Sequence, residues 1–214
     1  DVCSSDLREG RIRIYKRILM IRDFEECQNK TDEELVELIL KDHDYFICLM
    51  KRYDEKLIRY IVRISGIRKE DAEDLLQEIF IKVFKNLYDF DTKLKFSSWI
   101  YRIARNHTIS SFRKAKSHGE LNMIDLNDEV VHNISSGINI EKNIDSSIIK
   151  ESVGAVLRDM DLKYREVLVL RYIEEKDYKE ISDILKKPIG TVATLINRAK
   201  KQFKSNAERN NIKF

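Results

Sequence analysis

The sequence predicts an all-α protein: two small helical domains, an N-terminal helical bundle and a C-terminal helix-turn-helix, joined by a flexible acidic linker. Apolar residues recur at helical spacing along most of the chain, and a second, separate series carries a helix-turn-helix signature. Between Lys116 and Lys150 the periodicity disappears. At 214 residues and 43% apolar content, the chain is long enough for one large or two small cores.

The expected organisation has five parts. Residues 1–30 form a flexible or artefactual N-terminus, because there is no initiating Met and Asp1 to Leu7 resemble a translated sequencing-adapter remnant. The two domains are expected at 31–117 and 151–207. Asn, Ser, Gly and acidic residues dominate 118–150, which predicts a partly mobile linker, and 208–214 form a tail.

The first domain is expected to hold about four helices. The first begins at Thr31, where Glu34 three residues later completes a capping box. The second follows the apolar series over 46–64 and ends at Gly66. The third covers 70–87 and begins in an acidic cluster, whose carboxylates suit the positive end of a helix dipole.

The fourth helix is expected to carry a nucleic-acid surface. Residues 92–118 contain no Asp or Glu, yet they hold cations interleaved with aromatic rings: Lys93, Lys95, Arg102, Arg105, Arg113, Lys114 and Lys116, with Phe96, Trp99, Tyr101 and Phe112. At about 100° per residue, a helix capped by Ser97 or Ser98 places the arginines on one arc and Phe96, Ile100 and His107 on the other. The cationic arc suits phosphates, and the aromatic rings suit stacking on unpaired bases. The alternative is an ordinary solvated helix face. The absence of acids argues against it, because a solvated face in so charged a chain would carry both signs of charge.

The second domain carries the helix-turn-helix pattern. Asp177 and Glu180 form a capping box, and the turn over 186–190 holds the only proline. Beyond the turn, Val192, Ile196, Ala199 and Phe203 recur at helical spacing and leave outside Thr191, Thr194, Asn197, Arg198, Lys200, Lys201 and Lys204. A generic helical hairpin is the alternative, but no acid occurs between residues 184 and 207.

The remaining composition argues against several other classes. The net charge of +3 conceals strong segregation of acids from bases along the chain. No apolar run approaches a membrane span and no signal peptide is visible, so a cytoplasmic location is expected. Cys3, Cys27 and Cys48 form no CxxC, so neither a disulfide framework nor a zinc site is expected.

Catalysis by this chain alone is not expected. The four histidines are scattered without metal-ligand spacing, and the sequence has no glycine-rich phosphate loop and no nucleophile elbow. We therefore expect no catalytic residue, no metal and no cofactor.

Both domains resemble the extracytoplasmic function (ECF) sigma factors. Residues 71–80 (DAEDLLQEIF) and 96–106 (FSSWIYRIARN) are similar to region 2 of that family. Residues 164–168 (YREVL), 178–181 (YKEI) and 188–192 (PIGTV) are similar to its region 4. The resemblance covers nearly the whole chain from about residue 31, with the motifs in the right order.

The resemblance implies an alternative sigma factor, which binds core RNA polymerase and directs promoter-specific initiation. The clamp helices of the polymerase largest subunit would contact Asp74, Gln77, Glu78 and Lys82. The -10 element would be melted and read by Phe90, Phe96, Trp99, Arg102, Arg105, Asn106 and Arg113, and the loop from Phe90 to Phe96 would capture a flipped base. The -35 element would meet Thr191, Thr194, Asn197, Arg198 and Lys201. An anti-sigma factor is a further expected partner.

The recognition helix departs from the family pattern. Lys186 stands where the family often has Gly in the turn, and Ala193, Thr194 and Leu195 replace Lys-Ser-Arg, which removes two basic groups.

Two other functions compete with the sigma-factor interpretation. A stand-alone helix-turn-helix regulator predicts tight duplex binding without polymerase, at a symmetric operator. A protein that only binds partner helices leaves both acid-free basic segments unexplained.

Overall fold

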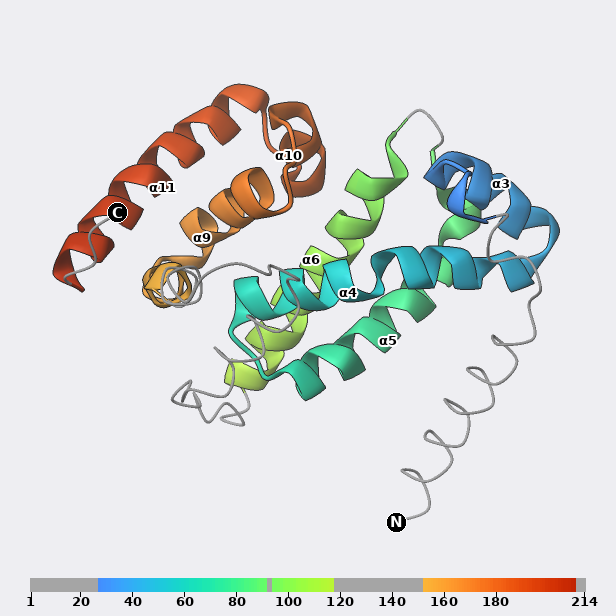
Figure 1. The fold of residues 1–214 in the computed structure, drawn as a ribbon, viewed down its shortest axis with the longest axis horizontal. Coiled ribbons are helices and arrows are strands. Elements are labelled where there is room, and N and C mark those ends of the chain that lie inside the picture. Colours follow the sequence, from blue (N-terminus) through green and yellow to red (C-terminus); the bar gives the residue numbers. More distant parts are fainter. Residues whose placement is uncertain (1–26, 92–93, 118–151, 211–214) are drawn as a thin grey trace, which may run out of the picture. The chain divides into compact units, whose positions relative to one another are not determined.

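The computed structural model describes residues 27–91, 94–117 and 152–210 (Figure 1). Within these ranges every regular element is a helix, which confirms the all-α prediction. The predicted linker and nearly all of the predicted N-terminal segment lie outside the described residues. The chain divides into two compact units, residues 1–53 and 54–214.

In the first unit, α3 (Asp32–Lys41) begins as expected. Glu34 N donates to Thr31 Oγ1 at 3.2 Å and Thr31 N donates to Glu34 Oε2 at 2.7 Å, which completes the predicted capping box. A short 3₁₀ turn, η1 (His43–Tyr45), follows and leads into α4 (Phe46–Ser65). Arg52 of α4 donates to Asp32 at 2.6 Å and to the Cys27 and Lys30 carbonyls at 2.8 Å each, so its guanidinium holds the segment before α3 in place.

The first unit also corrects the cysteine prediction. Cys27 and Cys48 form a disulfide with their Cα atoms 6.0 Å apart, although no disulfide was expected. The number and spacing of cysteines along the chain do not tell which thiols meet in space. Cys48 lies on the buried side of α4, and the segment that Arg52 holds brings Cys27 to the same place. Cys3 lies outside the described residues.

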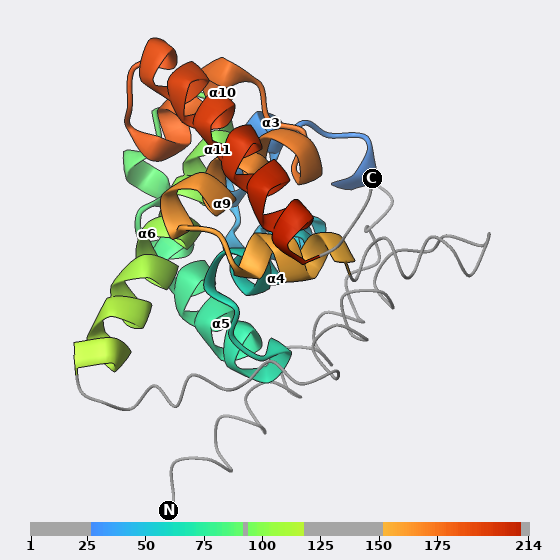
Figure 2. The same ribbon diagram turned by 90° about the vertical axis from the view of Figure 1, so that its left-hand side faces the viewer.

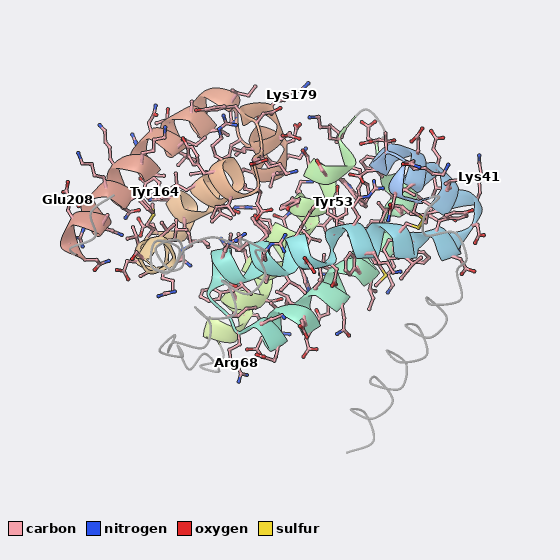
Figure 3. The ribbon with its side chains drawn as sticks, in the orientation of Figure 1. Lys41, Tyr53, Arg68, Tyr164, Lys179 and Glu208 are labelled. Atoms are coloured by element: carbon pink, nitrogen blue, oxygen red, sulfur yellow. A yellow bond between two sulfur atoms is a disulfide. The ribbon has the colours of Figure 1, made fainter. Side chains whose placement is uncertain are left out.

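In the second unit, α4 ends at Gly66 as predicted, with φ of 75°, a left-handed conformation that glycine adopts without steric cost. α5 (Lys69–Lys85) carries Glu70 and Asp71 in its first turn, and Arg68 pairs with Asp71 at 3.1 Å and points outward (Figure 3). The buried face of α5 consists of Ala72, Leu76, Ile79, Phe80 and Val83. A 3₁₀ turn, η2 (Leu87–Asp89), closes this segment.

α6 (Phe96–Ser117) packs along α5. Its start corrects the predicted cap: Ser97 and Ser98 lie inside the first turn. The Lys95 carbonyl accepts from Ser98 N at 3.1 Å and from Trp99 N at 3.2 Å, so the backbone of Lys95 occupies the capping position. Ser98 Oγ is buried without a hydrogen-bond partner among the described residues.

The C-terminal helices form the predicted helix-turn-helix. Residues 152–158 are helical, and α9 (Leu162–Leu168) runs into a π-helical turn, η3 (Val169–Ile173). α10 (Tyr178–Leu185) begins at the predicted Asp177–Glu180 capping box, and α11 (Ile189–Arg209) is the recognition helix. α9 and α11 lie side by side (Figures 1 and 2). Lys186 ends α10 in the left-handed conformation, with φ of 53°. Glycine adopts this conformation without steric cost, which explains why glycine suits this turn.

Candidate nucleic-acid and polymerase interface

α6 divides into the two faces that its sequence periodicity predicts. Asn106 and Arg113 are exposed and Arg102 and Arg105 are half-buried, whereas Ile100, Ala104 and His107 are buried. The arginines and Asn106 therefore lie along one side of a helix whose other side is fixed in the core. This placement suits contact with a nucleic-acid backbone.

The aromatic residues before and within α6 form a packed cluster. The ring centroids of Phe90, Phe96 and Trp99 lie 5.2 to 5.5 Å apart. Phe96 is 0% exposed, and Phe90 and Trp99 are each 7% exposed. Phe96 offers no free face to a base in this conformation and instead supports the other two rings. Direct contact of these residues with DNA stays a prediction.

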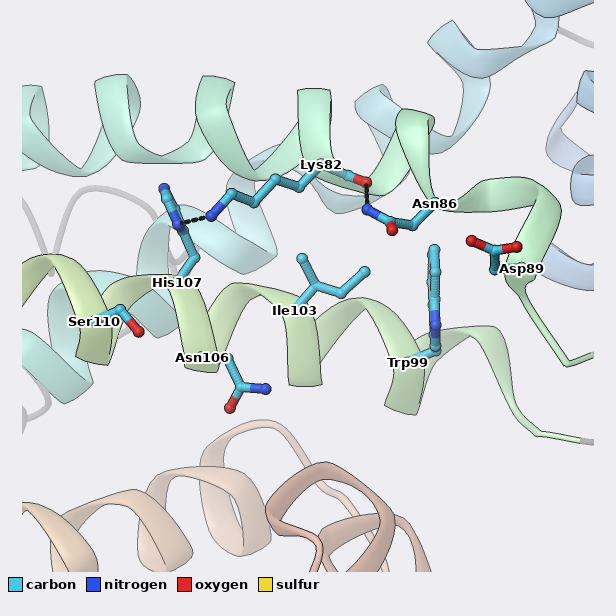
Figure 4. Close-up of a pocket in the computed structure, with 8 residues that line it drawn as sticks. All are labelled: Lys82, Asn86, Asp89, Trp99, Ile103, Asn106, His107 and Ser110. Atoms are coloured by element: carbon cyan, nitrogen blue, oxygen red, sulfur yellow. Dashed lines mark hydrogen bonds between the residues drawn. The ribbon is translucent and has the colours of Figure 1, made fainter.

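A pocket of about 390 Å³ opens between α5 and α6 (Figure 4). α6 contributes an indole, an aliphatic side chain and polar groups, and α5 with η2 contributes polar and charged groups. The lining residues are Lys82, Asn86, Asp89, Trp99, Ile103, Asn106, His107 and Ser110. The sequence placed Lys82, Trp99 and Asn106 at functional positions, and the structure brings these three to one cavity.

A hydrogen-bonded chain runs along one side of this pocket. Lys82 Nζ lies 2.6 Å from His107 Nδ1 (Figure 4). On the other side of the ring, His107 Nε2 lies 2.8 Å from Glu78 Oε2. The ammonium can only donate, so Nδ1 accepts and Nε2 carries the hydrogen that it donates to Glu78. His107 thereby links two predicted polymerase-binding residues to the helix predicted to bind DNA. Sequence periodicity placed His107 in the core, and nothing in the sequence signals these two partners.

The predicted polymerase-binding residues lie on the outer side of α5. Asp74, Gln77, Glu78 and Lys82 are all exposed. Ile81 lies among them and is 54% exposed, an apolar side chain that the sequence analysis did not single out. The sequence could have predicted this exposure, because Ile81 lies outside the helical arc that contains Ile79, Phe80 and Val83. A polar face with an apolar centre suits a protein partner.

α11 also divides into a buried apolar face and an exposed polar face, as the sequence predicts. Val192, Ile196 and Ala199 are fully buried, whereas the expected -35 residues are all exposed: Thr191, Thr194, Asn197, Arg198 and Lys201. Thr194 Oγ1 donates to the Gly190 carbonyl at 2.9 Å. Leu195 is half-buried at the edge of the apolar stripe.

Three carboxylates from the C-terminal part of the chain contact α6 or the residue that precedes it. Glu166 forms an ion pair with Arg105, Glu174 accepts from the Tyr101 hydroxyl at 2.5 Å, and Glu180 lies 3.1 Å from Lys95 Nζ. Burial raises the pKa of Glu166, against the opposing effect of the hydrogen bonds from Arg105. These contacts join residues separated by 61 to 85 positions, and no local sequence signal predicts them.

Comparison with known proteins agrees with this geometry. Residues 49–118 match the family model for Sigma-70 region 2, and residues 150–203 match that for Sigma-70, region 4. Over 167 residues the chain is 34% identical to the ECF RNA polymerase sigma factor SigW of Bacillus subtilis, covering 76% of this chain and 89% of that protein. The chain belongs to the ECF sigma factors. It is an alternative sigma factor, which directs promoter-specific transcription initiation by RNA polymerase.

Other relatives of this sigma factor cover similar lengths. It is 28% identical over 186 residues to the ECF RNA polymerase sigma-E factor of Haemophilus influenzae, covering 84% of this chain and 96% of that one. Two solved structures share its fold: CnrH in complex with the cytosolic domain of CnrY, and RpoE in complex with the anti-sigma factor NepR from Bartonella quintana. The match to CnrH has a TM-score of 0.62 at 21% identity and covers 84% of this chain and 99% of CnrH. The match to RpoE has a TM-score of 0.58 at 20% identity and covers 76% of this chain and 96% of RpoE. These matches give no support to the stand-alone regulator. None of the described helices is long and apolar enough to cross a membrane.

Proposed function

We propose that this sigma factor divides its work between three surfaces. The exposed side of α5, with Asp74, Gln77, Glu78 and Lys82, binds the clamp helices of the polymerase largest subunit. The pocket between α5 and α6 and the adjacent cationic face capture the opened -10 strand. The exposed side of α11 enters the major groove at the -35 element. In this division residues 31–117 carry the first two functions and residues 151–207 carry the third.

The pocket is the observation that carries this proposal. Its volume of about 390 Å³ accommodates a planar base, and its lining combines Trp99 and Ile103 with the amides of Asn86 and Asn106. Flipping a base out of a duplex costs a few kcal/mol. Stacking on an aromatic side chain returns about 1–3 kcal/mol per base, and hydrogen bonds to the amides add to it. Arg102 and Arg113 lie on the same helix to hold the strand's phosphates.

The C-terminal surface reads duplex DNA. Thr191, Asn197 and Arg198 are exposed towards the N-terminal half of α11, which is the part of a recognition helix that reaches base edges. Lys201 follows one turn later and binds a phosphate.

An anti-sigma factor is a further partner in this proposal, supported by the fold shared with RpoE in its complex with NepR. The protein acts in the cytoplasm, where its polymerase is.

The test separates polymerase binding from promoter opening. Asn106→Ala should leave affinity for core polymerase unchanged and reduce the rate of promoter opening at least tenfold, because Asn106 lines the pocket. The double variant Asp74→Ala with Gln77→Ala should weaken polymerase binding and leave opening by saturated holoenzyme intact. Fluorescence anisotropy measures binding, and permanganate reactivity of unpaired thymines measures opening. Each variant is the control for the other, and equal effects on both steps would contradict the division.

A further inference from the structure

The first turns of α11 carry no charged side chain. Residues 188–197 contain no Lys, Arg, Asp or Glu, although charged residues make up 36% of the chain. The solvent side of a helix ordinarily carries charged and polar groups. Ala193 and Leu195 stand where ECF sigma factors often carry basic residues. The outward side of this segment therefore offers a partner apolar groups in place of cations.

Four residues at the start of α11 form a small apolar surface. Ile189, the first residue of the helix, is 51% exposed. Ala193 is half-buried and lies four residues later, on the same row of the helix surface. Gly190 and Thr194 form the neighbouring row, and both are exposed. Ile189, Gly190, Ala193 and Thr194 are called the methyl patch below.

Thr194 belongs to this patch because its polar group is engaged by its own helix. Thr194 Oγ1 donates to the Gly190 carbonyl at 2.9 Å. Threonine in a helix commonly donates in this way to the carbonyl four residues earlier. The hydroxyl hydrogen is therefore already bonded, and the methyl group is the part of Thr194 left to contact a partner.

Gly190 has no structural reason to be glycine. A Cβ added at Gly190 would meet open space, and the backbone there is not left-handed. Glycine inside a helix is also destabilising relative to alanine. A partner that comes close to the backbone supplies the missing reason, because the absence of Cβ lets the first turn of α11 approach the floor of a groove.

The C5-methyl group of thymine is the apolar feature of the DNA major groove. Alanine and the methyl group of threonine recognise it by direct contact. A recognition helix places its N-terminal residues against base edges, which is where the methyl patch lies. Arg198, Lys201 and Lys204 are exposed on the following turns of α11. Their charge suits phosphates, so it favours DNA over a protein as the partner of this helix.

We propose that the methyl patch reads thymine methyl groups in the -35 element. Ile189, Ala193 and Thr194 contact C5-methyl groups in the major groove, and Gly190 lets the helix come close enough for these contacts. The proposal rests on the -35 role given above to α11 and names the chemical feature that this surface recognises. It makes this end of α11 specific for A·T pairs in one orientation, because only the thymine strand carries the methyl group.

Replacement of thymine by deoxyuridine tests the proposal on the DNA. Deoxyuridine pairs as thymidine does and lacks only the C5-methyl group. Wild-type holoenzyme first selects duplexes from a randomised library, and the tightest-binding duplex is remade with one thymine at a time replaced. We expect at least one replacement in the -35 element to weaken binding roughly fourfold, the effect of one buried methyl group. Replacements outside the bound region are the control and should leave the affinity unchanged.

Thr194→Ser tests the same contact on the protein. The substitution keeps the hydroxyl group that bonds the Gly190 carbonyl and removes the methyl group. In Thr194→Ser or in Ile189→Ala, we expect the thymine and deoxyuridine duplexes to bind equally at the position that the lost group contacts. Lys201→Ala is the comparison, because loss of a phosphate contact should weaken binding to both duplexes and preserve the roughly fourfold difference between them.

Gly190→Ala tests the close approach. The added Cβ meets open space in the free protein, so we expect the melting temperature to be unchanged or higher. Affinity of the holoenzyme for the selected duplex should nevertheless fall roughly tenfold, because the new methyl group collides with the base edges. Affinity equal to that of wild type would refute the role given to Gly190.

The outcomes separate this inference from the proposed function. Absence of any deoxyuridine effect within the -35 element would overturn the inference. An effect that persists in full in both Thr194→Ser and Ile189→Ala would also overturn it, because the methyl groups would then act through DNA shape and not through contact. Failure of wild-type holoenzyme to select any -35 element would instead contradict the proposed function.

Discussion

His107 shows how one buried side chain can hold two others in position. It lies 9% exposed between Lys82 and Glu78, accepting from the first and donating to the second. A neutral imidazole is required, because a protonated ring cannot accept from an ammonium. His107 therefore fixes the position of Lys82 at the pocket rim and of Glu78 on the outer side of α5.

Replacing His107 tests this positioning role. His107→Phe keeps a buried ring and removes both hydrogen bonds, so we expect promoter opening to slow about three- to tenfold while the melting temperature changes by only a few degrees. His107→Gln retains an acceptor and a donor and should recover much of the rate. Stopped-flow opening assays with saturating polymerase make the measurement, and equal rates for all three proteins would contradict the role.

At the scale of helices, the capping boxes decide where α3 and α10 begin. Asp177 Oδ1 accepts from Glu180 N at 2.7 Å, and Asp177 N donates to Glu180 Oε2 at 2.9 Å. The hydrogen bond from the Glu180 backbone lowers the pKa of Asp177 below its ordinary value of 3.8. The ionised cap therefore stabilises the helix-turn-helix above that pH, and the contribution is lost as the pH falls through the lowered pKa.

Asp177→Ala should cost about 1 kcal/mol of unfolding free energy at neutral pH, because an N-cap acceptor is lost. Asp177→Ser keeps an acceptor and should cost less. Urea titrations followed by circular dichroism give these differences. The gap between wild type and Asp177→Ser should narrow as the pH falls below 3.8, and a gap that widens there would refute the stabilising role of the ionised cap.

The same scale shows what sequence can predict here. The starts of α3 and α10 and the apolar stripe of α11 depend on residues three to eleven positions apart, and all three were predicted. The start of α6 was misplaced because a backbone carbonyl, not a serine, takes the first amides. The disulfide and the contacts of Glu166 join distant residues, and periodicity carries no information about such pairs. Of the residues that line the pocket, the sequence placed only Lys82, Trp99 and Asn106 at functional positions, and it did not predict the cavity.

At the scale of the whole molecule, the proposed binding surfaces differ in the sign of the charges that they carry. The outer side of α5 carries acids and an amide beside Lys82, whereas α6 and α11 carry exposed cations. Each phosphate neutralised by a cation contributes about -0.9 to the slope of log affinity against log salt. Binding of the holoenzyme to duplex promoter DNA should therefore weaken steeply with salt.

Lys201→Ala should reduce the magnitude of that slope by about one and weaken binding to all duplexes alike, because a phosphate contact carries no sequence information. Arg198→Ala should instead lower discrimination between a promoter and an unrelated duplex. Filter binding at four salt concentrations with both DNAs distinguishes the two. A slope unchanged by Lys201→Ala would contradict its contact with phosphate.

The disulfide between Cys27 and Cys48 makes one part of this chain sensitive to oxidants and reductants. It spans 21 positions, and closing a loop of that size stabilises a fold by about 3 kcal/mol through the entropy of the unfolded chain. α5, α6 and α11 contain no cysteine, so a thiol reductant acts on them only indirectly. We expect dithiothreitol to accelerate amide hydrogen exchange in α3 and leave exchange in α11 unchanged. The segment before α4 thus responds to the redox potential around the protein, while the surfaces proposed for DNA do not.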